Sequence, residues 1–259
     1  KKYHKIVNKI TEMLDFARKS GFVDKFSTIN SANYYTSHEA LLLDYEKAFL
    51  DKKKNKNPYC CSAHMLWVGE RTRYVNSDYI DFISNLSNPV GVKIGPGIKL
   101  DELCKLYETI NPTHDKGKLS LITRLGANKI DDVLPKLIEK IKYYGLEVLW
   151  LCDPMHGNTI KAKNGYKTRN FDTIIKELKS FFFIHEMYNT IPGGIHVELT
   201  GENVTECLGG ITNIQAHDLD KRYETTCDPR LNHEQSLEIA FLVSELLKKK
   251  GEKIETIKN

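Results

Sequence analysis

A regular alternation of short apolar runs and longer amphipathic segments begins near residue 59. The apolar runs are SAHMLWVGER (62–71), PVGVKIGP (89–96), KLSLITRLG (118–126), LEVLWLCDP (146–154), GGIHVELTG (193–201) and ETTCDP (224–229). Between them, the segments 100–110, 130–145 and 170–187 repeat apolar residues at helical spacing. Strands that alternate with helices are typical of βα units, so the pattern predicts an α/β fold with parallel strands.

Two segments precede the alternation or interrupt its start. Residues 4–20 are predicted to form an amphipathic helix that stops at Gly21, because apolar residues recur at helical spacing at Ile6, Ile10, Met13, Leu14 and Ala17. The Lys/Asn-rich stretch at 51–57 is predicted to be a surface loop.

The six predicted strands could form an open doubly wound sheet or most of a (β/α)₈ TIM barrel. Ionisable residues stand at or just past the C-terminal ends of these strands, at Arg71, Lys93, Arg124, His156, Glu198 and Asp228. Barrel enzymes collect their functional groups at this rim, which favours the barrel. No glycine-rich phosphate-binding fingerprint follows the first predicted strand, which weakens the nucleotide-fold alternative. We expect one α/β catalytic domain over residues 1–259.

Composition narrows the class of protein. Of the 259 residues, 41% are hydrophobic and 28% charged, and the formal net charge is +4. The lysines are scattered along the chain, so nucleic-acid binding is not the default expectation. No apolar stretch approaches the roughly 20 residues of a membrane-spanning helix. Six cysteines without a CxxC pair indicate reduced thiols, and we expect a soluble, cytoplasmic protein, or a plastid protein if its source is a plant.

Three short segments each deliver one side chain that can bind a metal. They are CDPMHGN (152–158), HVELTGEN (196–203) and CDPRLN (227–232), and the side chains are those of His156, Glu198 and Asp228. One imidazole and two carboxylates from three successive strand ends predict a site for a divalent cation with open coordination positions. This arrangement favours an enzyme over a binding module.

Several long motifs, in order, resemble the class II (plant-type) 3-deoxy-D-arabino-heptulosonate 7-phosphate (DAHP) synthases over nearly the whole chain. The segments are TSHEALLLDYE (36–46), CSAHMLWVGERTR (61–73), NPVGVKIGP (88–96), LSLITRLGANK (119–129), CDPMHGNTIKAKNGYKTRNFD (152–172), GGIHVELTGENVTECLGG (193–210) and RYETTCDPRLN (222–232). The resemblance implies a barrel enzyme of the shikimate pathway that condenses phosphoenolpyruvate with erythrose 4-phosphate and releases phosphate. It also implies a homo-oligomer at full length.

The resemblance assigns roles to residues by motif position. His156, Glu198 and Asp228 resemble three of the family's metal ligands, for which Mn²⁺ is the first expectation and Co²⁺ the second. The residues that resemble its phosphoenolpyruvate contacts are Glu70, Arg71, Lys93 and Arg124. Arginine can fork onto substrate oxygens, while Lys93 supplies a compact charge and a proton. Each of these three cations could instead be a strand-end charge paired with Glu70 or Asp153.

On this hypothesis the metal polarises the aldehyde of erythrose 4-phosphate. His156 binds it as a neutral imidazole whose second nitrogen faces an acceptor that the sequence does not identify. His38, His64 and His196 are expected to be structural.

One departure from the family pattern concerns its first two strands. The family carries a cysteine metal ligand on the first, and an arginine and a Lys-Pro-Arg-Ser run on the second, and these segments have no counterpart here. The chain is therefore expected to hold strands three to eight of eight. Strand alternation argues against Cys152 or Cys227 as a replacement ligand, and Cys61 should lie at the opposite rim. Two unpaired edges would make these residues alone poorly soluble or oligomeric.

Two segments keep alternative interpretations. Glu39 could reach the substrate pocket through water, or the Ser-His-Glu sequence could cap a helix start. The basic loop of Lys161, Lys163, Lys167 and Arg169 could close over a phosphate or be solvated surface, and we favour the surface. For the whole chain, the alternative to the synthase is a non-catalytic barrel remnant that binds metal or sugar phosphate, or pairs with a chain that supplies the missing strands. Retention of every candidate residue favours the enzyme.

Overall fold

The computed structural model describes residues 33–51 and 57–258, together with the single positions Asn8, Thr11, Glu12, Asp15 and Lys19. The chain divides into two units at Thr36 and Ser37, and the following account concerns the second unit, Ser37–Asn259. The helix predicted over 4–20 lies almost wholly outside the described residues, and so does the loop predicted at 51–57, apart from its two ends.

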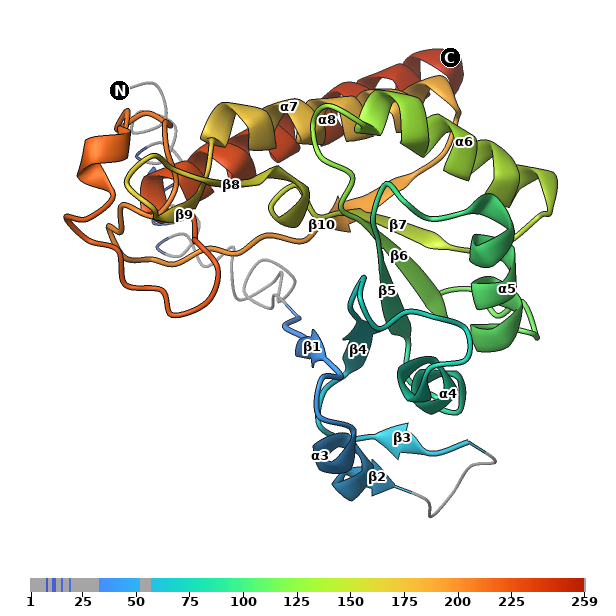
Figure 1. The fold of residues 1–259 in the computed structure, drawn as a ribbon. Helices are drawn as coiled ribbons and strands as arrows, with labels where there is room; N and C mark the ends of the chain where they lie inside the picture. Colours follow the sequence, from blue (N-terminus) through green and yellow to red (C-terminus); the bar gives the residue numbers. More distant parts are fainter. Residues whose placement is uncertain are drawn as a thin grey trace. The chain divides into compact units, whose positions relative to one another are not determined.

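A six-stranded parallel sheet forms the centre of this unit (Figure 1). In spatial order its strands are β1 (Ser37–Glu39), β4 (Met65–Val68), β5 (Val90–Ile94), β6 (Leu119–Thr123), β7 (Leu149–Cys152) and β10 (Pro192–Ile195). Every neighbouring pair is parallel. Spatial order equals chain order, so each connection leads to the adjacent strand. The predicted parallel α/β fold is confirmed, and β1 and β10 are the edges of the sheet as described.

Helices connect the strands and pack against one another in the same order. They are α4 (Asp78–Ser84), α5 (Leu100–Ile110), α6 (Ile130–Tyr143), α7 (Phe171–Met187) and α8 (His233–Lys258). Three of them start at a side-chain cap, because Ser77 accepts a hydrogen bond from the Ile80 amide, Asn170 from the Asp172 amide and Asn232 from the Gln235 amide. A further short helix, α3 (Leu43–Ala48), follows β1.

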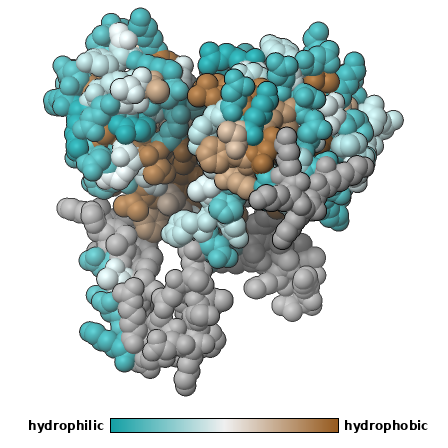
Figure 2. All heavy atoms as spheres, turned by 90° about the horizontal axis from the view of Figure 1, so that it is seen from below, coloured by the Kyte–Doolittle hydropathy of each residue, from teal (hydrophilic) through white to brown (hydrophobic). Residues whose placement is uncertain are grey.

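The core lies between the sheet and the helices. All residues of β5 and β6 are buried, as expected for strands covered on both faces. Leu103 of α5, Leu134 of α6 and Leu178 of α7 are fully buried against them. The face shown in Figure 2 is mainly polar, with apolar residues gathered near its middle. No helix among the described residues is long and apolar enough to cross a bilayer.

Two antiparallel strand pairs and two 3₁₀ turns are also found in the described part of this unit. The antiparallel pair β2 (Leu50–Asp51) and β3 (Tyr59–Cys60) precedes β4. The hairpin of β8 (Thr159–Lys161) and β9 (Lys167–Arg169) follows the 3₁₀ turn His156–Asn158. A second 3₁₀ turn spans Ala216–Asp218.

The predicted strand at 224–229 does not form. Its backbone donors are already used, because the amides of Glu224 and Thr225 donate to the buried carboxylate of Glu206 and the amide of Cys227 donates to Thr225 Oγ1. Local side-chain acceptors of this kind compete with a strand ladder. Beyond β10, the parallel contacts in the described chain are two isolated bridges, between Asn170 and Leu208 and between Leu199 and Leu231.

The sheet also contains a strand that the hydrophobic pattern did not predict, namely β1. Ser37, His38 and Glu39 pair with Met65, Leu66 and Trp67 of β4. The capping role considered for this segment is therefore wrong, because α3 begins later, at Leu43, and its N-terminal cap has no side-chain hydrogen bond.

Candidate functional site

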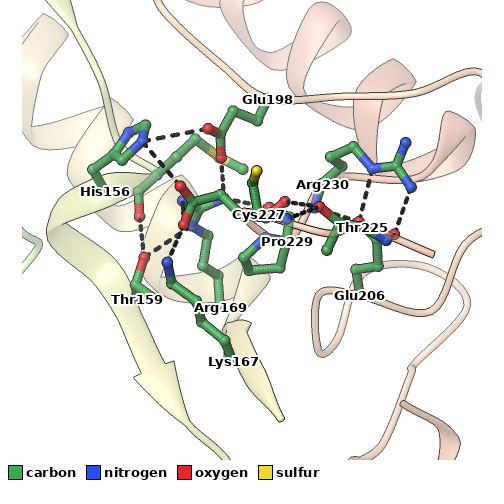
Figure 3. A network of polar contacts seen from close by, with 12 residues as sticks. His156, Thr159, Lys167, Arg169, Glu198, Glu206, Thr225, Cys227, Pro229 and Arg230 are labelled. Atoms are coloured by element: carbon green, nitrogen blue, oxygen red, sulfur yellow. Dashed lines mark hydrogen bonds and ion pairs between the residues drawn. The ribbon is translucent and has the colours of Figure 1, made fainter. Parts of the chain in front are cut away.

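Three side chains from three loops converge beyond the C-terminal ends of β7 and β10 (Figure 3). His156 opens the turn after β7, Glu198 follows β10, and Asp228 lies in the loop that Glu206 holds. Nε2 of His156 lies 3.3 Å from Glu198 Oε1 and 3.9 Å from Asp228 Oδ2. One ligand atom from each residue lies within 4.8 Å of the other two. The structure brings the three predicted metal ligands together.

The outer oxygens of both carboxylates are held by cations. Arg169, fully buried at the end of β9, donates from Nη1 to Glu198 Oε2 at 2.5 Å. Its Nη2 lies 3.7 Å from Asp228 Oδ1, which also pairs with Lys167. Arg169 is itself fixed by Thr159 Oγ1, at 3.1 Å, and by the carbonyl of Pro229. The inner oxygens are therefore left facing the imidazole.

Asp153 orients the imidazole from the other side. Its Oδ2 accepts from His156 Nδ1 at 2.7 Å and from Lys93 Nζ at 2.5 Å. Its Oδ1 accepts from the amides of Met155 and His156 at 3.0 and 3.1 Å. With Nδ1 bonded to Asp153, Nε2 is the nitrogen available to a cation. Asp153 is thus the acceptor that the sequence left unidentified.

The local charges set the protonation of this group. Burial alone would raise the pKa of Asp153, but hydrogen bonds from His156 and Lys93 bring that pKa far below its usual range. Burial opposes ionisation of Glu198 and Asp228 as well, yet His156 and Arg169 lower the pKa of Glu198 and Lys167 lowers that of Asp228. Burial lowers the pKa of His156, whereas Asp153 and Glu198 raise it further than burial lowers it.

The donor set fits a divalent cation. Metal–ligand bonds of about 2.0 to 2.2 Å place neighbouring ligand atoms about 3 to 3.5 Å apart. The observed separations of 3.3 and 3.9 Å from Nε2 are close to that range. One nitrogen and two carboxylate oxygens suit first-row divalent metals and leave coordination positions open.

A cavity of about 360 Å³ adjoins His156. It is lined by Glu70, Gly95, Pro96, Arg124, the segment 125–129 and His156, Gly157 and Asn158. Arg124 Nη2 donates to the His156 carbonyl at 3.1 Å, while its buried Nε has no hydrogen-bond partner in the described residues. Glu70 accepts from the Gly95 amide at 2.5 Å and from Arg73 at 3.0 Å. The cavity thus offers a guanidinium group beside the ligand cluster.

Of the other two predicted substrate contacts, Lys93 lies next to the ligand cluster and Arg71 lies away from the cavity. Lys93 is buried, bonded to Asp153 and 4.6 Å from the centre of the Trp67 ring, so the strand-end pairing considered for it does occur. Arg71 is exposed just after β4 and is not among the residues that line the cavity. Arg73 takes the place beside Glu70. Glu70, Arg124, Lys93 and His156 are brought together, and Arg71 is not.

Arg169 corrects the surface interpretation of the basic loop. Lys161, Lys163 and Lys167 are exposed, but Arg169 is fully buried against Glu198. Alternation along β9 does not single out Arg169, because Lys167 is on the same face of the strand and is exposed. For Asp153, the available signal was its position three residues before His156 in the same turn.

The cysteines do not join the ligand group. Among the described residues, the only cluster with metal-binding geometry is that of His156, Glu198 and Asp228. Cys152 and Cys207 are buried, which raises the pKa of both thiols, to about 12 for Cys207. Cys227 is exposed. Because its segment is not a strand, the alternation argument used for Cys227 does not apply.

The sequence of this chain is similar to those of known proteins along almost its whole length. Residues 1–244 match the family model described as the Class-II DAHP synthetase family. The chain is similar to the phospho-2-dehydro-3-deoxyheptonate aldolase AroG of Mycolicibacterium smegmatis (strain ATCC 700084 / mc(2)155), with 47% identity over 256 residues, covering 95% of this chain and 54% of the relative. It is equally similar to the phospho-2-dehydro-3-deoxyheptonate aldolase of Streptomyces coelicolor (strain ATCC BAA-471 / A3(2) / M145), with 47% identity over 248 residues and the same coverages. The chain spans about half the length of these curated relatives.

Proposed function

The chain belongs to the class-II DAHP synthetase family, and we therefore propose that the protein carrying it condenses phosphoenolpyruvate with erythrose 4-phosphate. The products are DAHP and phosphate, in the first step of the shikimate pathway to aromatic amino acids. The observation that carries the proposal is the convergence of His156, Glu198 and Asp228 beside a cavity that Arg124 lines.

His156, Glu198 and Asp228 would hold the divalent cation, Mn²⁺ in the first instance and Co²⁺ in the second. When bound, such a cation supplies Lewis-acid polarisation of an aldehyde oxygen. Asp153 holds the imidazole in the tautomer whose Nε2 is available to the cation. Arg169 binds Oε2 of Glu198, so that Oε1 of the same carboxylate faces Nε2 of His156. These contacts preorganise the ligands, so less ordering is needed when the cation arrives.

Arg124, Glu70 and Lys93 are the proposed phosphoenolpyruvate contacts. Arg124 has an unpartnered Nε for an anionic oxygen, and a planar guanidinium suits carboxylate and phosphate groups. Lys93 Nζ lies 3.4 Å from His156 Nδ1 and 2.5 Å from Asp153 Oδ2, which supports a place for this side chain beside the proposed metal ligands. Arg71 remains proposed as a contact on its motif position alone.

The architecture proposed for the whole enzyme is an eight-stranded barrel. The six observed strands would be its strands three to eight, with β1 third and β10 eighth, and the two sheet edges would receive the remaining strands. The single catalytic domain over 1–259, homo-oligomeric assembly and cytoplasmic location stay predictions.

The direct test is a turnover assay on this chain and on any longer protein that contains it. We expect phosphoenolpyruvate to be consumed only when erythrose 4-phosphate and Mn²⁺ or Co²⁺ are both present, and EDTA to stop the reaction. Consumption that does not depend on the aldehyde would contradict the proposal. Metal and phosphoenolpyruvate binding without turnover by the longest available protein would favour the non-catalytic remnant.

A further inference from the structure

Glu177 is a buried carboxylate behind the cavity and is not part of the ligand cluster. It lies on α7 and is fully buried. Its Oε1 accepts from the amides of Leu125 and Gly126, at 3.0 and 2.9 Å. Its Oε2 accepts from Asn158 Nδ2 at 2.6 Å. A helix side chain therefore holds the backbone of the loop that follows β6.

Asn158 extends the same network to the turn that follows β7. Its Nδ2 also donates to the Pro154 carbonyl at 2.8 Å, and its Oδ1 accepts from the Ala127 amide at 3.0 Å. The side chain thus uses both ends, one toward each loop. Because its amide donates to Glu177 and its carbonyl accepts from Ala127, neither end can be exchanged without losing a bond.

The two loops touch through their backbones at the point where Glu177 and Asn158 join them. A Cβ atom on Gly157 would lie 2.5 Å from the Gly126 nitrogen, so glycine is needed for this approach. Gly126 also has a φ of +83°, in the region that favours glycine. The first loop carries Arg124 and the second carries His156, and Arg124 donates to the His156 carbonyl at 3.1 Å. These two loops supply most of the cavity lining.

We propose that Glu177 and Asn158 are positioning residues for phosphoenolpyruvate, which hold the loop after β6 against the turn after β7 so that Arg124 faces the cavity, while Asp153 holds His156 separately. The inference rests on the proposed function, because it concerns the same site. An ionised acceptor that binds two backbone amides in a dry interior makes strong, directional bonds. Displacement of a binding group by about 1 Å can cost up to about a hundredfold in catalysis.

The electrostatics agree with a dedicated role. Burial raises the pKa of Glu177 to about 7, and only the hydrogen bonds from Gly126, Asn158 and Leu125 keep it from rising further. A carboxylate of this kind is costly to bury, and an apolar side chain would fill the same space without that cost.

The first test compares Glu177→Gln with the unmodified chain by calorimetric titration of phosphoenolpyruvate and, separately, of Mn²⁺. The glutamine amide would place a donor against Asn158 Nδ2, which breaks one side of the network. We expect phosphoenolpyruvate to bind roughly tenfold more weakly, while the Mn²⁺ affinity is unchanged because Glu177 contacts none of the three ligands.

Glu46→Gln is the matched control. Glu46 is likewise a buried helix carboxylate with side-chain partners, but it lies near the start of β4, away from the cavity. The same substitution there should leave both affinities unchanged.

Exchanging the amide and the carboxylate between positions 158 and 177 gives an independent test. In Asn158→Asp alone, two carboxylates meet at the contact with Glu177. In the double variant Asn158→Asp/Glu177→Gln, the glutamine amide donates to the new aspartate, and the acceptors for Leu125, Gly126 and Ala127 remain. Only the bond to the Pro154 carbonyl is lost. We expect the double variant to bind phosphoenolpyruvate more tightly than either single variant.

The outcomes separate the two proposals. Equal phosphoenolpyruvate affinity in the unmodified chain and in Glu177→Gln overturns the positioning role. So does a parallel loss of phosphoenolpyruvate and Mn²⁺ affinity in Glu177→Gln, which would indicate general loss of structure. Failure of the unmodified chain to bind phosphoenolpyruvate at all, with Mn²⁺ binding intact, overturns the proposed function and this inference with it.

Discussion

Buried carboxylates lie near both ends of the central strands, but among the described residues only those at one end adjoin a cluster with metal-binding geometry. Near the start of β4, Glu46 accepts from Ser62 at 2.5 Å and lies 2.8 Å from His38 Nε2, with Cys60 Sγ 3.5 Å away. At the opposite end, Asp153 accepts from Lys93, His156 and two backbone amides. By burial and hydrogen bonding alone the two clusters look alike.

The two clusters differ in whether their nitrogen and oxygen atoms can still bind a ligand once their hydrogen bonds within the protein are made. Both oxygens of Glu46 have side-chain partners, and no described group near it forms a metal-binding cluster. Beyond β7 and β10, Nε2 of His156 and the inner oxygens of Glu198 and Asp228 face one another, next to a cavity. Convergent atoms with remaining binding capacity therefore distinguish a candidate site from a structural cluster.

The strongest test of this difference removes a ligand. His156→Ala or Glu198→Ala should weaken Mn²⁺ binding about a hundredfold to a thousandfold, if one ligand supplies about a quarter of the ~10 to 16 kcal/mol of a four-ligand site. Metal-dependent turnover should be lost. Competition with a chelator measures the affinity, and an unchanged value in either variant would remove this metal site.

The second test uses pH and Glu177. The pKa of this group is 4.5 in the reference state and about 7 in the folded protein. Its stabilising contribution is complete below pH 4.5 and is lost as the pH rises toward 7, by about 3 kcal/mol of unfolding free energy. Urea unfolding at pH 5 and pH 8 should show this fall in the unmodified chain and a smaller one in Glu177→Gln. Equal falls would show that Glu177 titrates normally.

The third test concerns Arg169. Lysine keeps the charge but cannot reach Glu198, Thr159 and Pro229 together, so Arg169→Lys should weaken Mn²⁺ binding about tenfold to a hundredfold. Lys163→Arg, on the exposed part of the same hairpin, is the control and should change nothing. The Mn²⁺ affinity of both variants is measured by titration. An equal loss of affinity in both would show that the effect comes from the hairpin as a whole and not from Arg169.

The fourth test separates the two halves of the candidate site. Arg124→Ala should weaken phosphoenolpyruvate binding about tenfold, the loss expected for a charge-assisted contact. The Mn²⁺ affinity should stay the same, because Arg124 contacts only the carbonyl of His156. A drop in metal affinity would show that the halves are not separable in this way.

The smallest effect on ligand binding is expected from Glu46→Gln, because Glu46 lies away from the candidate site. The loss of charge-assisted bonds to Ser62 and His38 should lower the unfolding free energy by about 1 to 3 kcal/mol. Neither Mn²⁺ nor phosphoenolpyruvate affinity should change. If one of them did, the contrast between the two ends of the strands would no longer hold.

The sequence predicted five of the six strands of the sheet, and the clearest of them are the two that are buried on both faces. Continuous apolar runs identify β5 and β6, because no polar alternation is needed there. β1 was missed because it has three residues and is only partly buried. The strand predicted at 224–229 was wrong for a non-local reason, since the competing acceptor is Glu206, some twenty residues earlier in the chain.

The residues of the candidate site can likewise be divided into those that the sequence identified and those that only the structure identified. His156, Glu198 and Asp228 could be selected from the sequence, because each lies in a family motif. Arg169 was hidden among lysines of similar charge, and only burial distinguishes it from them. Arg71 was expected at the cavity from its motif position at a strand end, and the turn after β4 instead exposes Arg71 and buries Arg73.

The double use of Asp153 Oδ2 connects the two halves of this rim. One oxygen is shared by the ammonium group of Lys93 and the imidazole of His156. A single acceptor atom therefore joins a proposed metal ligand to a proposed phosphoenolpyruvate contact, and a substitution of Asp153 would remove the support of both at once.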